Sequence, residues 1–95
     1  MTEPVCKIHP NGDKEWWLNG KLHRTDGPAV ERANGHKEWW LNGQLHRTDG
    51  PAVELANGGK EWWLNGRIFY LEEYIMELER LGLKDSIVDV FFNIG

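Results

Sequence analysis

The sequence predicts a β-rich α+β fold: a meandering antiparallel sheet built from 23-residue β-hairpin repeats, with a C-terminal helical cap. Three observations predict it. The hexapeptide EWWLNG occurs three times, and each copy begins 23 residues after the last. Asn-Gly dipeptides, which favour tight hairpin turns, occur twice in every copy. Residues 68–95 abandon this repeat and space their apolar side chains as a helix does.

The repeat extends beyond the hexapeptide, because the decapeptide LHRTDGPAVE occupies both residues 22–31 and residues 45–54. Repetition at such a period is typical of arrays whose units bury apolar faces against one another. A chain of 95 residues forms one small domain. We divide it into an N-terminal capping strand (1–13), hairpin repeats (14–67, with turn repeats beginning near residue 11) and the helical cap (68–95).

Each copy is expected to form a hairpin, a short return strand and a loop. Asn-Gly suits the type I′ turn, in which both central residues have positive φ. In the second copy, residues 28–32 and 37–41 are the expected strands, and the next Asn-Gly reverses the chain into residues 44–46. The RTDGP segment that follows has turn chemistry. The run 4–10 is one residue longer than its counterpart 28–33, which predicts a β-bulge or an altered edge there.

The C-terminal segment carries a helical apolar stripe. Its members are Leu71, Tyr74, Ile75, Leu78 and Leu81, with charged residues on the other side. Gly82 suits the end of this helix. A second short helix, capped by Asp85 or Ser86 and running through Phe92, is our preferred interpretation. The β-branched and aromatic residues of this stretch would also suit a strand.

Adjacent residues on a strand point to opposite faces, so the three Trp-Trp pairs predict two ladders. One ladder comprises Trp16, Trp39 and Trp62, and the other comprises Trp17, Trp40 and Trp63. If each copy adds two strands, equivalent tryptophans lie roughly 10 Å apart. Residues between them must fill the gaps, and the candidates are Ala29, Val30, Ala52 and Val53. Two interpretations remain: both ladders are core, or part of one ladder is an exposed recognition face that the helix leaves uncovered.

Composition narrows the classes of function. The net charge of −4 and the pI near 5.5 argue against nonspecific binding to nucleic acid, which needs clustered Lys and Arg. Cys6 is the single cysteine and forms no intrachain disulfide, which favours a reducing compartment. Residues 1–6 lack the apolar stretch of a signal peptide, and no run approaches the ~20 apolar residues of a membrane span. We therefore expect a cytoplasmic protein that has no membrane contact.

The HRTD segments at residues 23–26 and 46–49 resemble fragments of an acid–base site, since a carboxylate can orient a histidine. A repeat, however, distributes identical groups along a line, whereas catalysis needs them to converge. We expect Asp26 and Asp49 to cap turns, and Arg24 and Arg47 to pair with Glu31, Glu54 or neighbouring residues. The histidines lack the spacing of zinc ligands. The sequence thus predicts neither an enzyme, nor a cofactor, nor a metal site.

The repeat resembles the membrane occupation and recognition nexus (MORN) repeat. The 23-residue period, the aromatic residue before Asn-Gly, the Lys21-Leu22-His23 that follows it and the later glycine carry this resemblance. Here Arg24-Thr25-Asp26 precede Gly27, and Trp-Trp replaces the usual tyrosine-glycine. The string WxNGxxHRxDGPA also resembles a repeat of small bacteriophage and bacterial proteins. Both resemblances, which cover about residues 4–66, imply a noncatalytic binding scaffold, and the second suggests a phage origin.

We therefore expect a protein-interaction module that binds through an aromatic face or through the tail. Aromatic and Arg side chains dominate binding hot spots, which selects Trp17, Trp40, Trp63, Arg24 and Arg47 as partner-binding residues. In a phage, the partner would be a host enzyme, such as a nuclease, or a defence complex that the protein inhibits, as anti-CRISPR proteins do. One alternative is a nucleotide or small-ligand sequestering protein that uses the Trp and Arg ladder. Another is a self-assembling structural protein, such as a homodimer formed through open sheet edges or through the apolar run 87–94.

Overall fold

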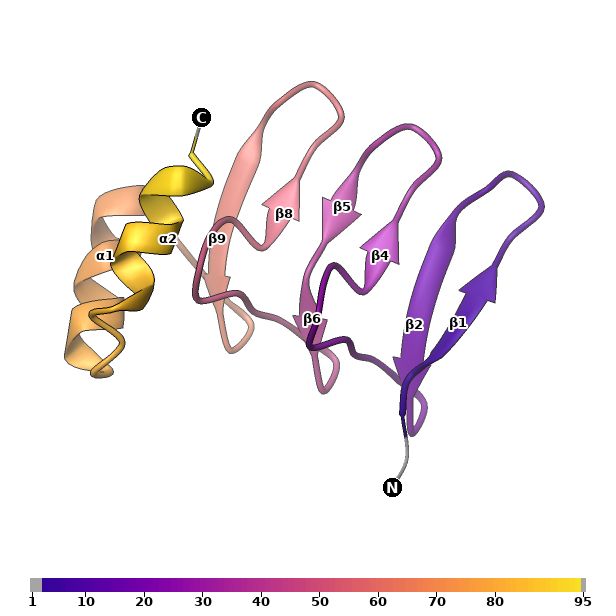
Figure 1. The fold of residues 1–95 in the computed structure, drawn as a ribbon, viewed down its shortest axis with the longest axis horizontal. Helices are drawn as coiled ribbons and strands as arrows, with labels where there is room; N and C mark the ends of the chain where they lie inside the picture. The colour runs from indigo at the N-terminus through magenta and orange to yellow at the C-terminus, as the bar shows by residue number, and fades with distance from the viewer. Residues whose placement is uncertain (1–2, 95) are drawn as a thin grey trace.

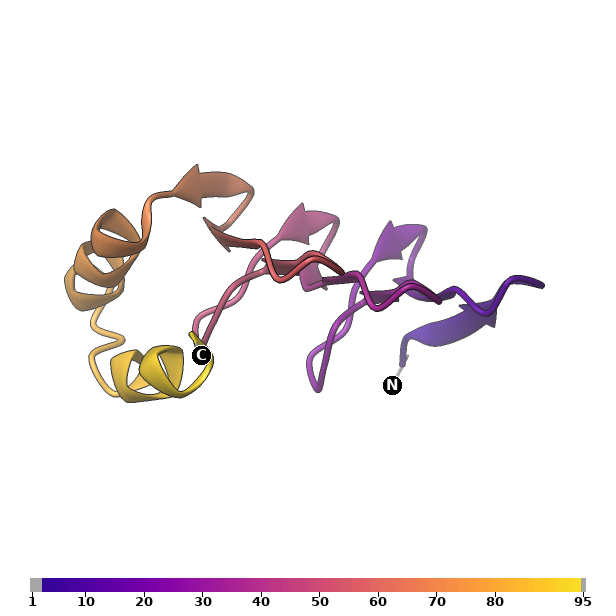
Figure 2. The same ribbon diagram turned by 90° about the horizontal axis from the view of Figure 1, so that it is seen from above.

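The computed structural model describes residues 3–94 and measures 39 × 35 × 19 Å along its principal axes. Three hairpin units stand side by side in the order of the sequence, and two helices close the end beyond the last unit (Figure 1). Seen from above, the units form a thin layer, and the helices turn out of it (Figure 2). The molecule is therefore one sheet-like array with a helical cap, as the sequence predicts.

All strand pairs are antiparallel. The main sheet has the order β1-β2-β4-β5-β8-β9-β10, with β3 also paired to β2, while β6 and β7 form a separate hairpin. These pairings confirm the meandering antiparallel sheet. The strands are β1 (Val5–Ile8), β2 (Lys14–Leu18), β3 (Lys21–Leu22), β4 (Val30–Glu31), β5 (Lys37–Glu38), β6 (Trp40–Leu41), β7 (Gln44–Leu45), β8 (Val53–Glu54), β9 (Lys60–Leu64) and β10 (Arg67–Phe69).

Each EWWL segment pairs with more than one other strand. In β2, Glu15 pairs with Val30 of the next unit, whereas Trp17 pairs with Leu22 of its own return strand. The backbone N–H of Trp16 also donates to the carbonyl of Ala29, at 2.8 Å. Consecutive units are therefore joined through the main chain, which fixes their relative register.

The two Asn-Gly dipeptides of a copy form different turns. Asn42 and Gly43 both have positive φ, at 50° and 78°, as a type I′ turn requires. The prediction of the same turn at Asn34-Gly35 is wrong. There only the glycine has positive φ, at 97°, and it closes a three-residue loop through a 3.0 Å hydrogen bond to Arg32. The Asn34 side chain accepts the N–H of His36 at 3.0 Å, which adds a second hydrogen bond across this loop.

The β-bulge offered as one explanation of the longer first run is not found. β1 pairs with β2 without interruption, from Val5 with Trp17 to Ile8 with Lys14. The additional length of the run 4–10 extends this pairing and produces no bulge. The outer edge of β1 has no neighbouring strand among the described residues.

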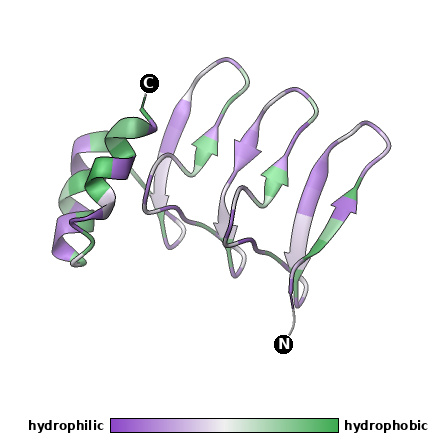
Figure 3. Ribbon diagram, viewed as in Figure 1, coloured by the Kyte–Doolittle hydropathy of each residue, from purple (hydrophilic) through white to green (hydrophobic). Residues whose placement is uncertain are grey.

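The residues proposed to fill the spaces between tryptophans lie in the interior. Ala29, Val30, Ala52 and Val53 are all buried. In Figure 3, much of the colour that marks strongly hydrophobic residues lies on the short strands β4 and β8 and on the helices. All six tryptophans are only half-buried, so neither ladder is a fully enclosed core.

Two helices form the cap: α1 (Leu71–Arg80) and α2 (Ser86–Phe92). The second helix is therefore confirmed in preference to a strand. α1 ends at Arg80, and Gly82 follows with φ +78° and donates to Glu79, while Leu83 donates back to Leu78. This is the Schellman arrangement that glycine allows at a helix end. Neither helix has the length and apolar character needed to cross a membrane within residues 3–94.

The cap packs on the last unit and forms the main apolar cluster. Leu64 of β9, Tyr74 and Leu78 of α1, and Val90 of α2 form its buried centre, with Trp62 packed against it. The helices thus cover the last member of the Trp16 ladder, as expected. Polar contacts fix the cap in place as well. The Tyr74 hydroxyl donates to the carbonyls of Arg47 and Gly50, and burial raises its pKa above the ordinary tyrosine value.

The Tyr74 hydroxyl provides a test of cap docking. We expect Tyr74→Phe to lower the free energy of unfolding by about 1–3 kcal/mol, because two backbone carbonyls lose their donor. The matched control is Tyr70→Phe, since Tyr70 is 79% exposed. Urea denaturation followed by tryptophan fluorescence measures both variants. Equal stabilities of the two variants would contradict this account of how the cap docks.

Candidate functional site

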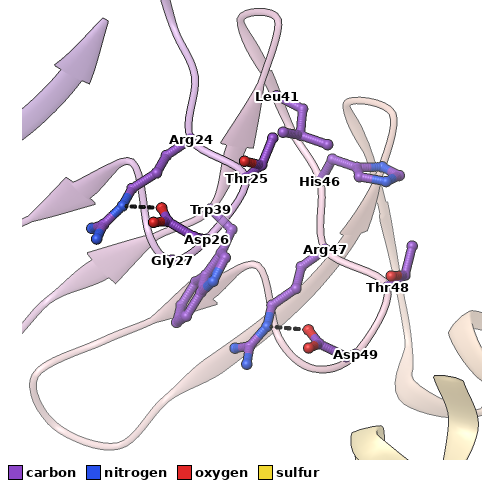
Figure 4. Close-up of a pocket in the computed structure, with 10 residues that line it drawn as sticks. All are labelled: Arg24, Thr25, Asp26, Gly27, Trp39, Leu41, His46, Arg47, Thr48 and Asp49. Atoms are coloured by element: carbon purple, nitrogen blue, oxygen red, sulfur yellow. Dashed lines mark hydrogen bonds and ion pairs between the residues drawn. The ribbon is translucent and has the colours of Figure 1, made fainter. Parts of the chain in front are cut away.

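A cleft of about 520 Å³ opens between two successive HRTDG loops. We call it the loop cleft. Trp39 lies between the two loops, and each loop contributes an Arg–Asp pair, as Figure 4 shows. The residues that line the cleft are Arg24, Thr25, Asp26, Gly27, Trp39, Leu41, His46, Arg47, Thr48 and Asp49.

Each arginine of the loop cleft lies over an indole ring. The Arg24 guanidinium carbon is 3.8 Å from the centre of the Trp16 ring, and that of Arg47 is 3.9 Å from Trp39. These are close cation–π contacts. The arginines fold back because their loops follow the EWWL strand and its return, which brings them above the first tryptophan of their own copy.

Each of these arginines also donates three hydrogen bonds through Nε and Nη1. Arg47 Nε donates to Asp49 at 2.7 Å, and its Nη1 donates to the Pro51 carbonyl at 3.0 Å and to Glu54 at 3.2 Å. The contacts of Arg24 at positions 23 residues earlier are equivalent. The structure thus confirms the expected pairing of Arg24 with Glu31 and of Arg47 with Glu54. The hydrogen bond from Arg24 lowers the pKa of Asp26, so this carboxylate stays ionised.

The other tryptophan ladder binds carboxylates. The indole N–H groups of Trp17, Trp40 and Trp63 donate to the glutamates two residues earlier, at 3.1, 2.8 and 2.9 Å. Residues two apart on a strand share a face, which explains the pairing. In the first two units a histidine adds a second contact to the glutamate. The hydrogen bond from His9 lowers the pKa of Glu15.

The five predicted site residues therefore fall into two groups. Arg24 and Arg47 line the loop cleft and stack on the Trp16 ladder, whereas Trp17, Trp40 and Trp63 bind glutamates on the other ladder. Backbone hydrogen bonds link the two groups. Arg24 N–H donates to the Trp40 carbonyl, and Arg47 N–H to that of Trp63, each at 3.1 Å.

The loop histidines accept hydrogen bonds from the next Asn-Gly turn along the array. Nδ1 of His23 accepts the backbone N–H of Asn42, and Nδ1 of His46 accepts that of Asn65, each at 2.9 Å. Each histidine therefore ties one unit to the Asn-Gly turn of the following unit. No group of three potential metal ligands occurs within residues 3–94. The arrangement favours hydrogen bonding and apolar contact over acid–base chemistry.

Two features of the cap lie outside the five predicted site residues, although the tail was among the expected binding elements. The first is a row of exposed side chains on α2, formed by Val88, Phe91 and Phe92. The second is a pocket beside Trp62, where the position equivalent to Arg24 and Arg47 holds Tyr70. The interruption of the repeat after Gly66 was the available signal for this pocket.

Comparison with known proteins adds no assignment: no family model matches the chain, and no curated protein or solved structure matches it significantly. The interpretation of the site therefore depends on its own geometry.

The loop arginines provide a second test. Arg47→Lys should lower the free energy of unfolding by about 1–3 kcal/mol, because an ammonium cannot stack on Trp39 and bind three acceptors at once. Arg80→Lys is the control, since that side chain is 68% exposed. Chemical denaturation compares the two variants with the unchanged protein. Unaltered stability in Arg47→Lys would mean that this arginine is free to bind a ligand instead.

The burial of His46 predicts that the stability of the protein depends on pH. Burial lowers its pKa from 6.5, so the unfolded chain takes up a proton at higher pH than the folded protein does. The contribution of His46 to stability is complete above pH 6.5 and is lost as pH falls from 6.5 toward the folded pKa.

The variant His46→Asn keeps an acceptor for Asn65 and does not titrate. It should therefore lose less stability than the unchanged protein between about pH 7.5 and about pH 5.5. Urea denaturation across this range measures the difference. Parallel stability profiles for the two proteins would reject a role for His46.

Proposed function

We propose that the protein is a noncatalytic interaction module, built from 23-residue hairpin units, that binds another protein through its helical cap. The observation that carries this proposal is the exposed apolar row of α2. Val88, Phe91 and Phe92 are 59%, 61% and 80% exposed. Their spacing places them on one side of the helix, and exposed apolar patches on such a small protein mark binding surfaces.

The opposite side of α2 already serves the core. Val90 is fully buried, and Ile87 and Ile94 pack against the same cluster. The helix is thus held by one apolar face and presents a second one outward. Two exposed phenylalanines on a fixed helix are suited to insertion into an apolar pocket, as hot-spot aromatics are at protein interfaces.

The negative charge of the cap indicates which charge the surface of the partner should carry. Residues 1–67 contain equal numbers of acidic and basic residues, so the whole net charge of −4 lies in residues 68–95. Asp85 and Asp89 each precede a member of the exposed row by three residues, which places them beside it. We therefore propose a partner whose apolar pocket has a basic rim.

The polar groups of the array support a scaffold more than an enzyme or a nucleotide trap. Arg24 and Arg47 are neutralised by carboxylates, and each covers one face of an indole. Stacking a base there would require breaking these contacts. In the phage setting that the repeat resemblance suggests, the partner is a host enzyme or defence complex in the bacterial cytoplasm, and binding blocks it.

The test is a pull-down from a bacterial lysate with three immobilised proteins. The double variant Phe91→Gln, Phe92→Gln should lose the captured protein by on the order of tenfold or more, because two aromatic anchors are removed. The matched control is Val5→Thr, Ile8→Thr, which removes equally exposed apolar side chains at the opposite end of the array. Circular dichroism verifies that all three proteins are folded.

Capture that also weakens with added salt would match the acidic cap. The proposal fails if the folded unchanged protein retains nothing, or if the phenylalanine variant captures as much protein as the control does.

A further inference from the structure

The third hairpin unit lacks the arginine that covers the first tryptophan in the other two. Arg24 lies over Trp16 and Arg47 over Trp39, and the next position in this series, 23 residues later, is Tyr70. Tyr70 is 79% exposed and precedes the first turn of α1. Trp62 is therefore the one member of its ladder with no guanidinium over its ring among the described residues.

A pocket of about 440 Å³ lies at this position, and we call it the Trp62 pocket. It shares with the sites of the two internal arginines the first tryptophan of the EWWL strand, and its other lining residues have counterparts in the earlier units. Lys60, Glu61 and Trp62 correspond to the Lys-Glu-Trp of the earlier units, and Ile68 and Phe69 correspond to the Leu-His that precedes each arginine. The remaining lining residues are Tyr70, Leu71 and Glu73.

The strand that would enclose the pocket is also missing. In the first two units the start of the EWWL strand pairs with the next short strand, as Glu15 does with Val30 and Glu38 with Val53. After β9 the chain enters the cap instead, and β9 pairs only with β8 and β10. The cap thus covers one part of Trp62, and the pocket adjoins the part of this residue that the cap leaves accessible.

The charges of the pocket suit a cation. Glu61 uses one carboxylate oxygen to accept the Trp63 indole N–H, and Glu73 has no ion-pair partner within residues 3–94. The one positive side chain in the lining, Lys60, directs its ammonium to the Gly58 carbonyl at 3.3 Å. The cap that borders the pocket carries the net negative charge of the chain.

We propose that the Trp62 pocket receives an arginine side chain from the protein partner. The guanidinium stacks on Trp62 as Arg24 and Arg47 stack on their tryptophans, and Glu73 binds it in place of the internal aspartates. The identity of the carrier depends on the proposed function, but recognition of the guanidinium does not. Arginine is preferred over lysine because only a planar guanidinium both stacks on an indole and bonds a carboxylate through its edge.

The experiment uses free amino-acid probes, so it needs no partner. N-acetyl-arginine amide is titrated into the isotope-labelled protein, and N-acetyl-lysine amide serves as the matched cation. Nuclear magnetic resonance follows the six indole N–H signals and the Glu73 amide. The variant Trp62→Phe identifies the signal of Trp62. The arginine probe should shift the Trp62 and Glu73 signals with a dissociation constant on the order of millimolar to tens of millimolar.

Internal controls are built into the chain. The Trp16 and Trp39 signals should not move, because their rings are already covered. Tyr70→Arg supplies the guanidinium from the chain itself and should abolish the response to the probe. Glu73→Gln should weaken it several-fold, and this variant keeps the test valid if Tyr70→Arg does not fold.

Equal responses to the arginine and lysine probes would overturn the proposal, as would an unchanged Trp62 signal. If the pull-down captures a protein through α2 while the arginine probe gives no response, the interaction module stands and the arginine pocket is rejected.

Discussion

The stack of an arginine on a tryptophan is the contact on which the order of the array depends. One guanidinium joins three segments: the EWWL strand through the indole, its own loop through an aspartate, and the next short strand through a glutamate. The loop between them has no regular structure, so side-chain contacts of this kind fix its path together with its hydrogen bonds to the next unit and to the cap. A desolvated cation–π contact contributes roughly 2 kcal/mol, a large share of the stability of a domain this small.

The features that follow from local chemistry were predictable from the sequence. Alternation along a strand separates Trp16 from Trp17, and helical spacing locates α1. The two Asn-Gly turns show the limit of such reasoning. The same dipeptide forms a type I′ turn at Asn42 and a three-residue loop at Asn34, where the asparagine side chain accepts a backbone N–H two residues on. That choice depends on the flanking chain and not on the dipeptide.

The candidate site was less predictable for a related reason. Strand alternation places each glutamate on the face of the second tryptophan, but it does not extend into a loop and could not show that Arg47 folds back over Trp39. In α2 both sides of the helix are apolar, and only tertiary packing shows that Val90 faces the core while Phe92 faces outward. The MORN-like character of the repeat and the phage origin remain predictions.

The two ends of the sheet differ in a way that affects how the molecule opens. At one end β1 has a single neighbour and all four of its residues are exposed, whereas at the other end β9 is held by the helix pair. In an array of units, stability is approximately a sum of local terms, so opening begins where neighbours are fewest. Transient fraying is therefore directed to the N-terminal hairpin, which lies far along the array from the cap (Figure 1). The first hairpin can open and close repeatedly while the exposed phenylalanines keep their positions.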